Sequence, residues 1–153
     1  MLKLPGNVKI DQLAFCAWTD EDEAQIKHQL HLEREDWITD TVHAKGEVFG
    51  QPGENWAKLQ FNYSLGMEVE ILRYLDGPNY CRELDLQGGQ QCHIGSHYVG
   101  QDGVPRLDAP VIQQVVTQSH TNPFLVENNK HYRYTIYNLL PKLGICFKII
   151  ERL

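Results

Sequence analysis

The chain has 153 residues, of which 42% are hydrophobic and 22% are charged, a balance typical of one folded domain and unlike that of a disordered chain. Fourteen lysines and arginines stand against 20 aspartates and glutamates, which gives a formal net charge of −6. This acidic excess argues against a nucleic-acid binder and a basic membrane-surface helix, and no apolar run approaches the roughly 20 residues that span a bilayer.

The first half of the chain predicts a strand, a helix and three further strands. Residues 8–16 form a compact apolar stretch that favours a strand. Thr19 and the acidic run behind it suit the start of a helix that continues through residues 24–32. In the best-patterned strand after it, Trp56 lies on one face and Ala57, Leu59 and Phe61 lie on the other. The three strands that follow the helix cover residues 40–49, 56–63 and 67–75.

After a polar connection at residues 77–90, the same order begins again. Residues 92–99 predict a strand, and Asp108-Ala109-Pro110 predicts the start of a helix. The apolar residues at 111, 112, 115 and 116 fit one helical face, and Asn122-Pro123 is expected to end the helix. The remaining strands are expected at residues 124–127, 132–138 and 145–152.

An internal repeat accompanies this pattern. Residues 65–75 align without gaps against residues 143–153, and residues 10–14 align against 91–95. Because order, spacing and residue identities agree, we expect a single α+β domain in which one βαβββ unit occurs twice. Its parts are module one at about residues 8–76, a linker at about 77–90 and module two at about 91–153.

In these segments the chain resembles the vicinal oxygen chelate superfamily, which includes glyoxalase I, methylmalonyl-CoA epimerase, extradiol dioxygenases and bleomycin-resistance proteins. The segments that carry the resemblance are Lys9–Phe15, Val69–Leu72, Cys92–Gly95 and Lys148–Glu151. The resemblance implies a glyoxalase-like fold, in which two tandem βαβββ modules form curled mixed sheets around a shared cavity.

The resemblance also implies four metal-ligand positions, which fall on Gln12, Glu70, His93 and Lys148. Gln12, Glu70 and His93 are a reasonable ligand set for a divalent Zn, Mn, Fe or Ni ion. Lys148 departs from the pattern, because metal-binding members carry a glutamate there and an ammonium group has no lone pair to offer. Lys148 could instead pair with Glu70 and take over the charge of the metal.

Two functions therefore stay open. The first is an enzyme of the lyase, isomerase or dioxygenase type that acts on a substrate with vicinal oxygens. The resemblance implies Glu70 as its general base, and Lys148 is a candidate acid or base. The second is a metal-free small-molecule binding protein, as the bleomycin-resistance members are, with Lys148 paired to Glu70. Further candidates for the wall of the pocket are His97, Trp56 and Tyr134.

The expected partner is a small-molecule ligand, with no nucleic acid and no membrane. Exposed strand edges favour association, so a homodimer is expected. Cys16, Cys81, Cys92 and Cys146 lie far apart and form no C-x-x-C pair, which predicts free thiols and a cytoplasmic location.

Overall fold

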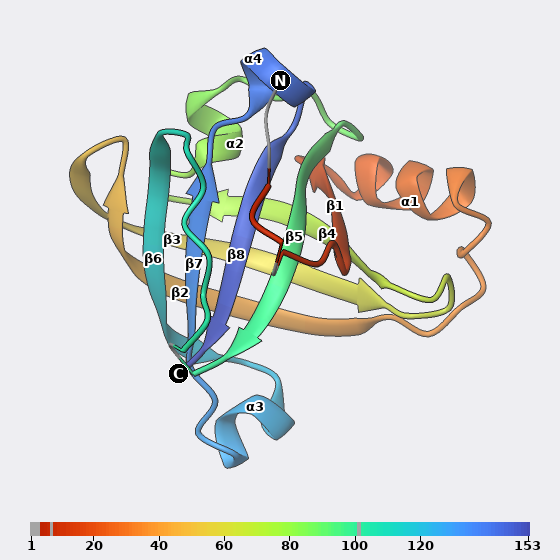
Figure 1. Cartoon of the computed structure of the whole chain (residues 1–153). Coiled ribbons are helices and arrows are strands. Elements are labelled where there is room, and N and C mark those ends of the chain that lie inside the picture. Colours follow the sequence, from red (N-terminus) through yellow and green to blue (C-terminus); the bar gives the residue numbers. More distant parts are fainter. Residues whose placement is uncertain (1–3, 7, 101) are drawn as a thin grey trace.

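The computed structural model describes residues 4–6, 8–100 and 102–153. The described residues form eight strands that close into one barrel (Figure 1). Around the barrel the strands follow the order β1-β4-β3-β2-β6-β7-β8-β5, with parallel and antiparallel neighbours. The expectation of an α+β chain with a curled mixed sheet is therefore confirmed at this level.

The first half follows the predicted order of elements. It contains β1 (Gln12–Ala17), α1 (Asp20–Gln29), β2 (Ile38–Val48), β3 (Gln51–Asn62) and β4 (Glu68–Asp76). Thr19 caps α1, because its side chain accepts from the backbone N–H of Asp22 while the Asp22 carboxylate accepts from the backbone N–H of Thr19. The helix packs outside the barrel, where Ile26 joins an apolar cluster with Val69 and Ile71 of β4.

The second half departs from the prediction in two places. It contains β5 (Gln91–Val99), β6 (Val111–His120), β7 (Tyr132–Tyr137) and β8 (Cys146–Arg152). The short helices outside the first half are α2 (Tyr80–Glu83), α3 (Pro123–Glu127) and α4 (Leu140–Leu143).

The predicted helix through residues 111–116 is wrong, because this segment is β6. The register shifts between Val111 and Gln113, and beyond it Val115 and Thr117 are buried in alternation. Such an irregularity breaks the phase of the strand, so apolar residues at 111, 112, 115 and 116 imitate helical spacing. Between β5 and β6, the described residues 102–110 contain no helix.

The predicted strand at residues 124–127 is also wrong, because these residues belong to α3. The side chain of Asn122 accepts from the backbone N–H of Phe124, and Pro123 occupies the start of the helix. Asn122-Pro123 therefore begins a helix and does not end one.

The barrel leaves no strand of the described chain at a free edge. β1 pairs with β4 in parallel and with β5 in antiparallel, and β2 pairs with β6 to complete the closure. The expectation of a homodimer rested on exposed edges, so it loses that support and stays a prediction.

The two ends of the barrel differ. The end beneath α2 and α4 is filled by an apolar cluster that includes Leu72, Ile112 and Ile136. The same cluster contains four buried cysteines, none of them in a disulfide, so the prediction of free thiols is confirmed. They are Cys16, Cys81, Cys92 and Cys146. At the other end, α3 lies beside a cavity. Within the described residues, no helix has the length and apolar character needed to cross a bilayer.

Candidate functional site

A cavity of about 300 Å³ lies inside the barrel next to α3. Much of its wall is apolar or aromatic, and this part includes Leu59, Phe61, Tyr132, Tyr134 and Ile150. Leu59 and Phe61 lie on one face of β3, as the alternation in the sequence predicted, and both line the cavity.

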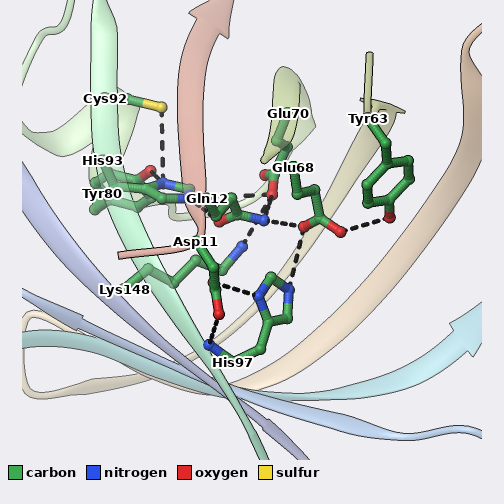
Figure 2. A network of polar contacts seen from close by, with 10 residues as sticks. All are labelled: Asp11, Gln12, Tyr63, Glu68, Glu70, Tyr80, Cys92, His93, His97 and Lys148. Carbon is green, nitrogen blue, oxygen red and sulfur yellow. Dashed lines mark hydrogen bonds and ion pairs between the residues drawn. The ribbon is translucent and has the colours of Figure 1, made fainter. Parts of the chain in front are cut away.

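The structure brings together the four positions that the resemblance implied (Figure 2). Gln12 Nε2 donates to Glu70 Oε2 at 2.8 Å, and His93 Nε2 donates to Gln12 Oε1 at 2.7 Å. Lys148 Nζ lies 3.5 Å from Glu70 Oε2 and 4.1 Å from the ring centroid of Tyr134. The four side chains meet because β4, β1, β5 and β8 are consecutive neighbours in the barrel. All four are buried, and Lys148 is only 4% exposed.

The hydrogen bonds assign the proton on His93. Both protons of the Gln12 amide nitrogen are used, on Glu70 and on Glu68 Oε1 at 2.5 Å, so its oxygen must accept from His93 Nε2. His93 Nδ1 then accepts from the hydroxyl of Tyr80 at 2.5 Å. Burial, together with the positive charges of Lys148 and His97, lowers the pKa of His93 well below its ordinary value, so the ring is neutral.

This arrangement does not fit a divalent metal. Both ring nitrogens of His93 have partners, the Gln12 oxygen faces His93, and an ammonium group lies beside Glu70. Within the described part of the chain, no three His, Cys, Asp or Glu side chains are grouped so that they could hold a metal ion. The metal stays a prediction from the resemblance, and the geometry favours the Lys148–Glu70 pair in its place.

Glu70 has an acceptor to spare. Its Oε1 is buried and has no hydrogen-bond partner among the described residues. Burial raises the pKa of Glu70 above its ordinary value, while the charge of Lys148 acts against that rise. Both residues line the cavity, so the unpaired acceptor and the ammonium belong to side chains of its polar part.

A second polar group surrounds His97, which also lines the cavity. His97 Nδ1 lies 2.7 Å from Asp11 Oδ1 and its Nε2 lies 3.2 Å from Glu68 Oε1, while the Tyr63 hydroxyl donates to Glu68 Oε2 at 2.6 Å. Burial alone would lower the pKa of His97, but its bonds to Glu68 and Asp11 reverse this and raise it. Burial alone would raise the pKa of Glu68, and the bonds to His97, Tyr63 and Gln12 lower it.

Trp56 is not brought to the cavity. It stacks on His43, with ring centroids 4.4 Å apart and an angle of 5° between the rings. Trp56 belongs to the face of β3 opposite Leu59 and Phe61, and these two line the cavity. Trp56 is therefore not part of the wall of this cavity, whereas Tyr134 and His97 line it.

Sequence reasoning missed two parts of the site. Tyr80, which donates to His93, is buried although it lies in the segment interpreted as a polar connection. Asp40 and His120 line the cavity on β2 and β6, with His120 Nδ1 2.7 Å from Asp40 Oδ2. Nothing in the local sequence marks Tyr80 as a partner of His93. Asp40 and His120 are 80 residues apart in the sequence, and only the β2–β6 pairing brings them together.

Searches against protein families and against curated proteins find no match to this chain.

Proposed function

We propose that the protein binds a small ring compound carrying a hydroxyl group in the barrel cavity, without a metal. The observation that carries this proposal is Glu70 Oε1, a buried acceptor with no partner among the described residues, beside the Lys148 ammonium.

A hydroxyl group suits this pair because it can donate one hydrogen bond and accept another. It would donate to Glu70 Oε1 and accept from Lys148 Nζ, which has three protons and a single contact of 3.5 Å to a carboxylate. A buried acceptor left without a donor costs about 1–3 kcal/mol. A ligand without a proton to donate therefore binds more weakly than a ligand with one.

The rest of the cavity favours a flat apolar body. Its aromatic wall includes Tyr132 and Tyr134, whose rings stack with centroids 6.1 Å apart. The volume of about 300 Å³ suits a compound of one or two fused rings. Apolar walls with a few convergent polar groups are the usual composition of small-molecule sites.

The two halves of the barrel are, on this proposal, copies of one βαβββ module, as in the vicinal oxygen chelate superfamily. In each half the first strand pairs in parallel with the last, and the strand order is the same. Gln12 lies opposite Glu68 and His93 opposite Cys146, which is the correspondence that the aligned repeat requires. The second half departs from this module in two ways: the described residues 102–110 contain no helix, and the short helices α3 and α4 lie between its later strands.

Isothermal titration with β-naphthol and with its methyl ether tests the proposal. The two compounds share the fused rings, and the ether lacks the proton that Glu70 would accept. We expect β-naphthol to bind about tenfold more tightly, which corresponds to roughly 1.4 kcal/mol. Equal affinities, or no binding of β-naphthol, would contradict the proposal.

A further inference from the structure

A second buried acceptor belongs to His120, a residue that lines the same cavity. His120 Nδ1 donates to Asp40 Oδ2 at 2.7 Å, and Asp40 Oδ1 accepts from the backbone N–H groups of Thr121 and Asn122, each at 2.9 Å. With a further bond of 3.4 Å from the Thr121 hydroxyl to Oδ1, Asp40 accepts four hydrogen bonds, as an ionised carboxylate does. The neutral His120 ring therefore carries its proton on Nδ1, and in this tautomer Nε2 offers a lone pair.

The described residues do not satisfy the hydrogen-bonding capacity of His120 Nε2. The side chain is only 4% exposed, lines the cavity, and its Nε2 has no hydrogen-bond partner among the described residues. Buried polar atoms are nearly always paired, so an unpaired ring nitrogen in a cavity wall points to a bound molecule. A histidine oriented by a carboxylate, with its other nitrogen free, has the arrangement of a general base.

The base and the Lys148 ammonium lie at opposite ends of one aromatic wall. Lys148 Nζ lies 4.1 Å from the ring centroid of Tyr134, which stacks on Tyr132 at 6.1 Å. Tyr132 in turn meets the His120 ring edge-on at 6.0 Å. A ring compound that lies along this wall would present its oxygen to Lys148 and a carbon at its far side to His120.

We propose that the cavity catalyses proton transfer at carbon in a conjugated cyclic ketone, with His120 as the general base and Lys148 binding the carbonyl oxygen. This inference rests on the proposed function, because it requires a ring compound to bind with its oxygen at the Lys148–Glu70 pair. The ketone has no proton for Glu70 Oε1, so it binds more weakly than its dienol, whose hydroxyl can donate.

The step conserves atoms and electrons without a co-reactant. The bond between hydrogen and the γ carbon breaks, and the proton moves to His120 Nε2. The electron pair moves through the conjugated double bond onto the carbonyl oxygen, which takes a proton from Lys148. The hydroxyl of the resulting dienol donates to Glu70 Oε1, and its proton returns to Lys148 when the carbon is protonated again. The proton then returns from His120 to the same carbon or to another carbon of the conjugated system. Conjugation is required because His120 and Lys148 contact opposite ends of the Tyr132–Tyr134 wall, so the proton leaves a carbon that is not adjacent to the carbonyl.

Asp40 is a positioning residue in this scheme. In an Asp40→Asn variant, the amide can donate a proton to Nδ1, which moves the ring proton to Nε2 and removes the base. This change should lower the rate of proton transfer. The affinity for the ring compound should stay within about twofold of the wild-type value, because a change of the His120 tautomer leaves the apolar contacts unaltered.

Hydrogen–deuterium exchange of isophorone in D₂O, followed by proton NMR, tests the inference. Isophorone is a cyclic enone with exchangeable γ hydrogens. We expect the wild type to exchange these hydrogens faster than buffer does, and His120→Gln to lower the protein-dependent rate by about 10²-fold or more. The control is His28→Gln on α1, whose side chain is 78% exposed, and its rate should equal that of the wild type.

Binding of β-naphthol and isophorone, measured in parallel, separates this inference from the proposed function. If both compounds bind and exchange does not exceed the buffer rate, or if His120→Gln exchanges as fast as the wild type, the catalytic inference is overturned and the proposed function stands. If β-naphthol binds and isophorone does not, the substrate class is wrong. If neither binds, both proposals fail. Should His120→Gln not fold, Asp40→Asn carries the same test.

Discussion

The Glu70→Gln variant tests the buried acceptor that underlies the proposed function. The substitution keeps the shape of the side chain and replaces Oε1, an acceptor, by an amide group that can donate. The side-chain oxygen would continue to accept from Gln12 and Lys148, so the new amide protons face the ligand. The oxygen of a bound ether can accept from this amide as well as the oxygen of a hydroxyl can.

The expected magnitude follows from the unpaired acceptor. In the wild type, the methyl ether of β-naphthol leaves Glu70 Oε1 without a donor, which costs about 1–3 kcal/mol and makes the ether bind roughly 5- to 150-fold more weakly than β-naphthol. In Glu70→Gln this ratio should fall to within about twofold of unity. Isothermal titration of both ligands at neutral pH measures it, and Glu47→Gln, at an exposed position of β2, is the matched control.

At acidic pH, the wild type should lose its preference for β-naphthol over the methyl ether, as Glu70→Gln does at neutral pH. Burial raises the pKa of Glu70 above its ordinary value of 4.5, so the carboxylate gains a proton at a higher pH than an exposed glutamate does. A protonated Glu70 can donate to the ether, and discrimination should vanish as the pH falls through this raised value. A folded Glu70→Gln variant that still prefers β-naphthol by tenfold would refute the reasoning, because the hydroxyl would then bind elsewhere.

Three further predictions concern the same network. Glu70→Gln and Lys148→Met should each lower the free energy of unfolding by about 3 kcal/mol, because each leaves a buried partner unmatched, and the double variant should lose less than the sum in urea denaturation. Additive losses would contradict a coupled pair. Gly95→Ala places a Cβ 2.9 Å from Gln12 Oε1, the atom that accepts from His93, so this variant should bind β-naphthol more weakly. Gly6→Ala is the control, because Gly6 has open space around it and its variant should bind β-naphthol as the wild type does. The raised pKa of His97 stabilises the fold fully below its ordinary value of 6.5 and progressively less as the pH rises through the folded-state pKa. The stability difference between the wild type and His97→Gln should therefore shrink above pH 6.5, and a difference that grows there would contradict the sign.

The first half of the fold could be predicted because its signals are local. Thr19 and the acidic residues after it mark the start of α1 within one turn of helix. The alternation of β3 separates Leu59 and Phe61, which line the cavity, from Trp56 on the opposite face. In both segments the sequence pattern and the tertiary contacts agree, so no long-range information is needed.

The second half could not be predicted equally well, because pairing partners decide its structure. The irregular register near Gln113 makes β6 resemble a helix in sequence, and only its neighbours β2 and β7 keep the segment extended. Pro123 can end one helix or begin another, and the sequence does not distinguish these roles.

The candidate site also has a part that could be predicted from the sequence and a part that could not. The resemblance to the vicinal oxygen chelate superfamily implied Gln12, Glu70, His93 and Lys148 as ligand positions, so these four could be grouped before their contacts were known. No repeat connects the second acceptor pair, formed between β2 and β6, since it depends on closure of the barrel. A histidine after a polar stretch carries no signal of its own until its partner strand is placed.

Nuclear Overhauser effects between bound β-naphthol and the methyl groups of the protein test the central claim most directly. We expect cross-peaks from the ligand to the methyl groups of Leu59 and Ile150, which line the cavity on β3 and β8. These cross-peaks should be unchanged after treatment with EDTA, because no metal takes part in the proposed binding. Cross-peaks confined to methyl groups outside the barrel, or cross-peaks that disappear on chelation, would contradict binding in the cavity without a metal.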